Sequence, residues 1–126
     1  MWMSKRLAPV ACFGALLAFT LAGCGGSRQS NEVDMGVATF EQGSVTIKAG
    51  QSVHFVDPTT GGTHLICVGQ GVTCIPQAGA PAELSASQGM TFNQGDTHDI
   101  VFPTAGTYNV VCIVHPGMQV TVTVTS

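Results

Sequence analysis

Three side chains with metal-binding chemistry lie close together near the carboxyl end of the chain: Cys112, His115 and Met118. They follow one another at intervals of three residues, so a strand end and a tight loop could turn all three toward one point. Soft sulfur ligands combined with imidazole select copper, and one Cys, two His and a weak axial Met form the copper centres that transfer electrons. The segment therefore predicts a copper site that needs one more imidazole.

The second imidazole has to come from elsewhere in the chain, and His64 is the preferred candidate. It follows a glycine pair at 61–62 and opens an apolar stretch well upstream of Cys112. His54 lies within an alternating apolar segment and is expected to pack or to face solvent. His98 competes for the position but has no glycine turn before it. We therefore expect His64, Cys112, His115 and Met118 to be the ligands, although a Cys or Met taken alone more often fills a core.

Length and composition exclude several classes of protein. The chain has 126 residues, of which 44% are hydrophobic and 9% charged, and this length accommodates one modest domain. Its four Lys and Arg residues cannot form the clustered basic surface that binding to nucleic acid requires. No pairing of a nucleophile with a general base and no glycine-rich phosphate-binding loop stands out, so we do not expect an enzyme.

The first residues have the pattern of an export signal. A short basic start is followed by an apolar run and small residues, which is typical of a secretory signal. The sequence Leu-Ala-Gly-Cys at 21–24 resembles the bacterial lipobox, which implies removal of residues 1–23 and lipid attachment to Cys24. An ordinary signal peptide or an uncleaved anchor helix is the alternative. Residues 24–32 have the composition of a flexible tether, so we expect the folded domain to span 33–126.

Export also bears on Cys67 and Cys74. An oxidising compartment permits disulfides, so this pair is expected to form one. A zinc site made by both residues with Cys112 and His115 is the rival interpretation. The spacing between Cys67 and Cys74 exceeds the usual two to four residues of zinc motifs, and Met118 would have no role in such a site.

The elements that must position these residues have the period of strands. Alternation of apolar and polar residues predicts strands at 37–40, 44–48, 52–56, 63–68, 96–102, 107–114 and 119–125. Residues 70–89 lack periodicity and are expected to be a loop. Seven or eight short strands separated by turn residues indicate an all-β fold, an antiparallel Greek-key sandwich or barrel.

Three stretches of the chain resemble the cupredoxins, the small blue copper proteins related to plastocyanin and amicyanin. They are the segment at 45–53, His64 after its glycine turn, and the segment at 102–108 that leads into Cys112. The resemblance implies His64, Cys112 and His115 as strong equatorial copper ligands and Met118 as the long axial one. Leu65 and Ile113 depart from the family, which often has Asn and Ser or Thr at these positions as a polar tie between the ligand loops.

The resemblance implies a type 1 copper protein that passes single electrons between redox partners on the cell envelope. The net charge of −3 would favour partners with a basic docking surface, such as a cytochrome or an oxidase. We expect a monomer, held by its lipid on the outer face of the cytoplasmic membrane or located in the periplasm. A copper carrier without a redox role is the main alternative, and a metal-free structural module is a third.

Overall fold

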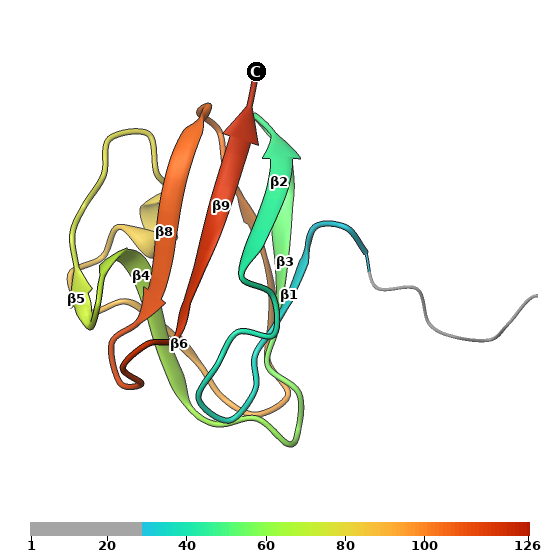
Figure 1. Ribbon diagram of the computed structural model, residues 1–126, viewed down its shortest axis with the longest axis vertical. Coiled ribbons are helices and arrows are strands. Elements are labelled where there is room, and N and C mark those ends of the chain that lie inside the picture. Colours follow the sequence, from blue (N-terminus) through green and yellow to red (C-terminus); the bar gives the residue numbers. More distant parts are fainter. Residues whose placement is uncertain (1–28) are drawn as a thin grey trace, which may run out of the picture.

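The structure is a computed structural model, and it describes residues 29–126 (Figure 1). The expected signal peptide, the lipid site at Cys24 and most of the tether lie outside the described residues. Within 29–126, no helix is long and apolar enough to cross a membrane. The one helix in this range is a single 3-10 turn at Ala82–Leu84.

Most of the strands form a larger, six-stranded sheet. Its path runs β2-β9-β8-β4-β5, and β6 pairs with the other part of β4. The bounds are Ser44–Lys48 for β2, His64–Gln70 for β4, Thr73–Cys74 for β5, Met90–Phe92 for β6, Gly106–Cys112 for β8 and Gln119–Thr125 for β9. The long pairing of β8 with β9 places the end of β8 at the start of the loop that returns to β9.

A smaller, three-stranded sheet faces the larger one in the order β1-β3-β7. Its strands are β1 at Glu32–Asp34, β3 at Ser52–Val56 and β7 at Thr97–Val101. The all-β class predicted from the sequence is confirmed. The pairings are mixed in direction, because β1 runs parallel to β3 and β2 runs parallel to β9.

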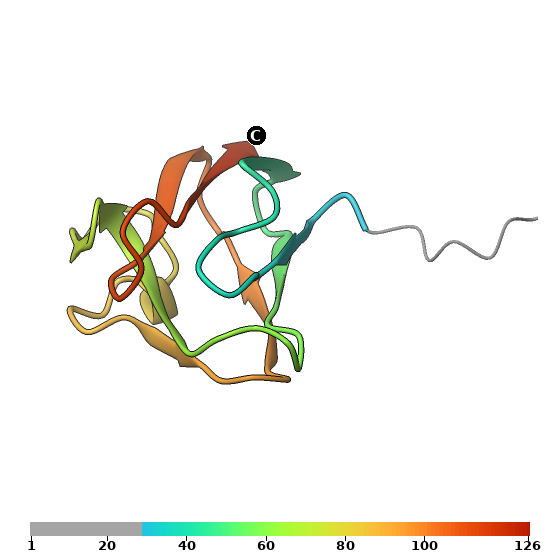
Figure 2. The same ribbon diagram turned by 60° about the horizontal axis from the view of Figure 1, so that its bottom comes forward.

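The core lies between the two sheets, and Figure 2 shows the strands arranged around it. The alternation read from the sequence produces it: in β2, Val45 and Ile47 are buried while their neighbours are exposed. In β9 the valines point inward and the two threonines between them are half-buried. Aromatic side chains fill the centre, where Phe55 packs edge-on to Phe92. Burial of each large apolar side chain contributes about 1.5–3 kcal/mol, which makes this core the main source of stability.

The opening and the middle of the chain differ from the expectation. The first strand is 32–34 rather than 37–40, and of the latter segment only Phe40 pairs, in an isolated bridge to Met35. Val37 is 68% exposed, so that segment has no buried partner to hold it as a strand. The range 70–89 contains a short hairpin strand and the 3-10 turn, and β6 follows it.

One end of the molecule gathers the loops that carry the candidate ligands. The connections β1–β2, β3–β4 and β8–β9 all lie at the lower end in Figure 1, opposite the carboxyl terminus. Because β4 and β8 are antiparallel neighbours, the start of β4 and the end of β8 meet there. His64 and Cys112 are therefore brought to one place by strand pairing.

Candidate metal centre

Three donor atoms from two parts of the chain converge at this end. The Nδ1 atoms of His64 and His115 are 3.2 Å apart, and the Sγ of Cys112 lies 3.9 Å from the first and 3.5 Å from the second. His64 is the first residue of β4, Cys112 is the last residue of β8, and His115 follows on the loop. Among residues 29–126 this is the group of His, Cys and acidic side chains whose geometry could hold a metal ion.

The size of this triangle fits a trigonal metal ion. Divalent ions of the zinc and copper kind bind imidazole nitrogen at about 2.0–2.1 Å and thiolate at about 2.3 Å. An ion in the plane of one sulfur and two nitrogens would then set an N–N edge of about 3.5 Å and N–S edges of about 3.8 Å. The observed edges lie within a few tenths of an ångström of these values. One thiolate with two imidazoles is the donor set that favours copper, so the residues present fit a copper ion.

Main-chain hydrogen bonds hold the ligand loop closed. The amide of Cys112 donates to the carbonyl of Met118 at 3.0 Å, and the amide of Met118 donates to the carbonyl of His115 at 3.1 Å. Gly117 sits at φ +84°, in the left-handed region where glycine is favoured, and this lets the loop turn tightly. The Cys-x2-His-x2-Met spacing is therefore matched by a compact turn.

A further main-chain bond ties the two ligand segments together. The amide of Ile113 donates to the carbonyl of Leu65 at 2.9 Å, one residue beyond Cys112 and His64 respectively. Both side chains are half-buried. The residues that depart from the family pattern thus still join the ligand segments, through their backbones.

The candidate ligands differ in their access to solvent. His64 and Cys112 are completely buried, and Met118 is 1% exposed. His115 is half-buried, and its neighbour Val114 is 47% exposed. Of the four candidate ligands, His115 alone reaches the surface, within an uncharged stretch of loop.

An unexpected carboxylate lies behind His64. Asp57 is fully buried, and its Oδ2 lies 4.0 Å from the Nε2 of His64, on the side of the ring away from Cys112. Burial raises the pKa of Asp57; His64 opposes this effect and Asp96 adds to it. Burial lowers the pKa of His64, while the Asp57 carboxylate and the backbone of Gly36 act in the opposite direction. Sequence reasoning missed Asp57, because an Asp before a Pro has the pattern of an exposed turn.

The two competing histidines lie elsewhere. The Nδ1 of His54 bonds to Asp99 Oδ1 at 2.7 Å on the smaller sheet. The ring of His98 packs edge-on against Phe92, with centroids 4.8 Å apart. The structure therefore brings His64, and neither of these residues, to the donor cluster.

Cys67 and Cys74 form a disulfide, with Cα atoms 5.6 Å apart. Both thiols are consumed by this bond, so the zinc site considered from the sequence is wrong. Cys112 is the free cysteine of the described part of the chain.

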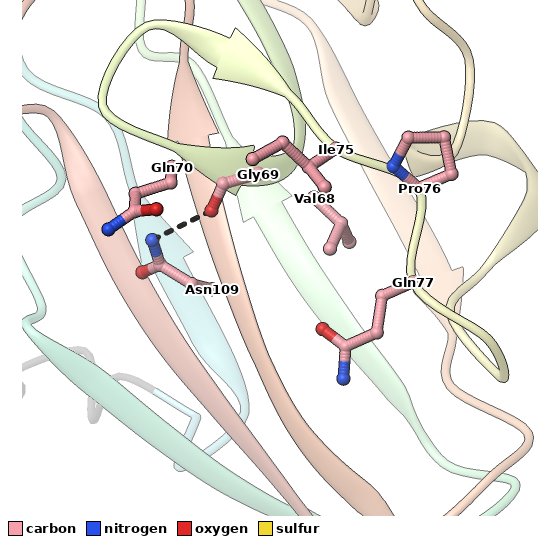
Figure 3. A pocket seen from close by; sticks show the side chains of 7 residues that line it. All are labelled: Val68, Gly69, Gln70, Ile75, Pro76, Gln77 and Asn109. Carbon is pink, nitrogen blue, oxygen red and sulfur yellow. Dashed lines mark hydrogen bonds between the residues drawn. The ribbon is translucent and has the colours of Figure 1, made fainter.

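A hollow of about 380 Å³ beside the disulfide hairpin is a separate feature (Figure 3). Asn109 Nδ2 donates to the carbonyl of Gly69 at 3.0 Å, a bond between two of the residues that line it. Its lining consists of apolar and amide side chains with no titratable group: Val68, Gly69, Gln70, Ile75, Pro76, Gln77 and Asn109. None of these residues belongs to the donor cluster, and the hollow offers no acid, base or nucleophile.

Comparison with known proteins agrees with this geometry. Residues 27–125 match the family model of copper binding proteins, the plastocyanin/azurin family. A plastocyanin from Scenedesmus fuscus is 38% identical over 93 residues, covering 72% of this chain and 91% of the relative.

Solved structures show the same fold. Amicyanin from Paracoccus versutus superposes with a TM-score of 0.53 at 24% identity, over 74% of this chain and 78% of that one. A reduced Cu(I) form of an amicyanin mutant at pH 4 gives a TM-score of 0.55 at 21% identity, over 74% and 79% of the two chains.

Proposed function

The chain belongs to the plastocyanin/azurin family of copper-binding proteins, and from this premise we propose that it is a type 1 copper protein that passes single electrons between redox partners at the cell envelope. The observation that carries the proposal is the triangle formed by the Nδ1 atoms of His64 and His115 and the Sγ of Cys112. Met118, buried on the same closed loop, would supply a further sulfur donor to the ion.

A fixed donor frame suits electron transfer because it changes little between two oxidation states. Copper bound by these donors would supply a one-electron redox couple. His64 and Cys112 are held by strand pairing, since Ile66 pairs with Cys112 and His64 pairs with Phe92. The loop bonds fix His115 and Met118 relative to Cys112. The backbone of the chain thus holds the four donor residues in one arrangement.

His115 is the proposed route by which electrons enter and leave. It is the candidate ligand that reaches the surface, and its loop neighbours Val114, Pro116 and Gly117 are exposed and uncharged. A redox partner could approach this surface closely without desolvating charge there. Encounters of redox proteins are small and transient, which a single exposed ligand edge accommodates.

The charge balance favours a basic partner, for which we propose a cytochrome or an oxidase. Among residues 29–126, Lys48 is the single Lys or Arg, and every acidic residue except Asp57 is at least partly exposed. The resulting negative potential would steer basic docking surfaces, more strongly at low salt. We propose that the protein acts as a monomer and has no enzymatic activity of its own.

Attachment to a membrane is part of the proposal. Its support is the sequence alone: the apolar leader and the Leu-Ala-Gly-Cys sequence that ends at Cys24. Acyl chains contribute about 0.8 kcal/mol per buried methylene, so two or three of them would retain the protein at the bilayer. Mass spectrometry of the membrane fraction would detect the removal of residues 1–23 and the acylation of Cys24.

A copper carrier without a redox role is the second candidate, and the enclosure of the sulfur donors argues against it. Open delivery sites expose several sulfur donors, whereas here Cys112 and Met118 are both buried within a closed loop. This enclosure favours a resident ion over one that is handed to a partner.

The test is an optical and paramagnetic spectrum of the purified protein after addition of Cu(II). We expect an intense thiolate-to-copper band in the visible range, with one copper bound per chain. Cys112→Ser should abolish the band while the fold persists, and His54→Gln should leave it unchanged as a matched control. A colourless protein that binds only Cu(I) would contradict electron transfer and favour the carrier.

A further inference from the structure

The buried pair of Asp57 and His64 is not explained by copper ligation alone. Both side chains have no exposed surface, and neither oxygen of Asp57 nor the Nε2 of His64 has a hydrogen-bond partner among the described residues. A buried polar group without a partner costs roughly 1–3 kcal/mol, and more if it is charged. Such a group in a folded protein requires a specific reason.

The surrounding backbone fixes the carboxylate where it faces the imidazole. The amide of Asp57 donates to the carbonyl of Asp96 at 2.9 Å, and the amide of Gly95 donates to the carbonyl of Asp57 at 2.8 Å. These bonds lie directly beyond the last β3–β7 pair, so they tie the main chain at Asp57 to the end of the smaller sheet. The position of its side chain follows from this anchoring.

Gly61, in the turn before β4, leaves the space that the Asp57 side chain occupies. A Cβ atom on Gly61 would overlap the Oδ1 of Asp57, and a Cβ on Gly62 would lie 3.6 Å from the Nε2 of His64 and 2.9 Å from the carbonyl of Val37. Neither glycine has a positive φ. Gly61 lacks the side chain that would overlap Asp57, and Gly62 lacks the one that would crowd the Val37 carbonyl.

We propose that Asp57 is a positioning residue for copper: its buried carboxylate lies 4.0 Å from the Nε2 of His64, beyond hydrogen-bond distance, and its charge favours a proton on Nε2, which leaves Nδ1 free for the metal, and favours Cu(II) over Cu(I). Histidine ligands commonly donate their second ring N–H to a carboxylate or a carbonyl, which fixes the tautomer and raises the basicity of the ligand. A nearby negative charge stabilises the more highly charged ion more strongly. The proposal rests on the copper function proposed above and adds to it a determinant of the reduction potential.

The backbone of Gly36 also faces the ring and acts in the same direction on the pKa of His64. It is neutral, so it can orient the ring but adds no net charge. The preference for Cu(II) that we assign to Asp57 should therefore be lost in a variant that removes the charge of this side chain and keeps its shape.

The experiment compares Asp57→Asn with Asp99→Asn in the full-length protein. Asp99 is the matched control because its side chain is 67% exposed and pairs with His54, away from the donor cluster. Cu(I) and Cu(II) affinities are measured by competition with chelators, and the reduction potential by electrochemistry. We expect Asp57→Asn to weaken Cu(II) binding about 10- to 100-fold and Cu(I) binding much less. Each tenfold loss that is selective for Cu(II) raises the potential by about 59 mV.

An Asp57→Asn variant that remains coloured but keeps the ratio of Cu(II) to Cu(I) affinity overturns the inference and leaves the proposed function intact. An equal change of this ratio in Asp99→Asn overturns the inference too, because removal of a distant charge would then have the same effect as removal of the Asp57 charge. Failure of the unmodified protein to give the visible band contradicts the proposed function instead.

A second measurement does not depend on the folding of the variant. In the Cu(I) form of the unmodified protein, nitrogen NMR should find a proton on the Nε2 of His64 that exchanges slowly with water. A proton there that exchanges rapidly with water overturns the inference, whereas an unprotonated Nε2 contradicts ligation through Nδ1 and therefore the proposed function.

Discussion

Replacing both Cys67 and Cys74 by Ala should destabilise the protein without changing its copper site. The disulfide closes a loop with a sequence separation of 7, from the middle of β4 to β5. Within this loop the hairpin has only two paired positions, Gly69 with Cys74 and Gln70 with Thr73. Cys67 itself pairs with Val111 of β8, so the bridge joins this short hairpin to a strand that the larger sheet already holds.

The expected magnitude follows from the length of the loop. The chain-entropy relation assigns about 2.4 kcal/mol at room temperature to closing a loop of this size in the unfolded state. Cys67 is completely buried, so its loss to Ala adds a small packing cost. We expect the free energy of unfolding to fall by about 2–3 kcal/mol, which leaves a typical domain folded.

Urea unfolding followed by circular dichroism measures this change. The free energy extrapolated to water is compared rather than the midpoint alone, because removing a cross-link also enlarges the surface exposed by unfolding. The copper spectrum is recorded on the same samples. It should be unchanged, because the His64 end of β4 is held by separate pairings with β6 and β8.

Two results would refute this reasoning. A loss below about 0.5 kcal/mol would mean that the loop is equally restricted without the bridge, against the loop-entropy estimate. A changed visible spectrum would mean that the hairpin supports the geometry of His64 and Cys112 through contacts that the strand pairing does not explain.

Two further predictions concern the stability of the fold. Tyr108→Phe should lower the free energy of unfolding by about 1 kcal/mol, because the buried Tyr108 hydroxyl donates to the exposed Thr104 carbonyl at 2.7 Å, and no change in urea unfolding would contradict this. In the metal-free protein, burial lowers the pKa of His64 below its ordinary 6.5, so the unfolded chain binds a proton that the folded chain does not. Stability should therefore fall as the pH drops below about 6.5, and His64→Gln should reduce this slope in urea titrations; an equal slope in both proteins would contradict it.

Much of the candidate site was predictable because its spacing is local. Cys112, His115 and Met118 lie within seven residues, so a strand end and a turn at Gly117 suffice to bring their backbones together. His64 could be named only through its glycine turn and a family resemblance. The local sequence does not show whether His64 or His54 lies nearer to Cys112. The pairing of Ile66 with Cys112 places His64 there.

The strands were also predicted correctly only where local pattern decides them. Alternation placed β2, β3 and β9 well, because each of these strands buries one face. The prediction of a strand at 37–40 was wrong, because the apolar Val37 faces outward. Strand pairing depends on a neighbouring strand, and this segment has only the isolated bridge of Phe40 to Met35. The parallel partners of β2 and β3 are likewise a property of the whole sheet.

By itself the amino-acid sequence determined the class of the fold and the chemistry of the ligand loop, because period-two alternation and short spacings encode local geometry. Only the tertiary structure decided which imidazole completes the donor set and that a carboxylate, Asp57, is buried behind it. Those outcomes depend on the register between β4 and β8 and on the space beside Gly61, and both are set by residues far apart in the chain.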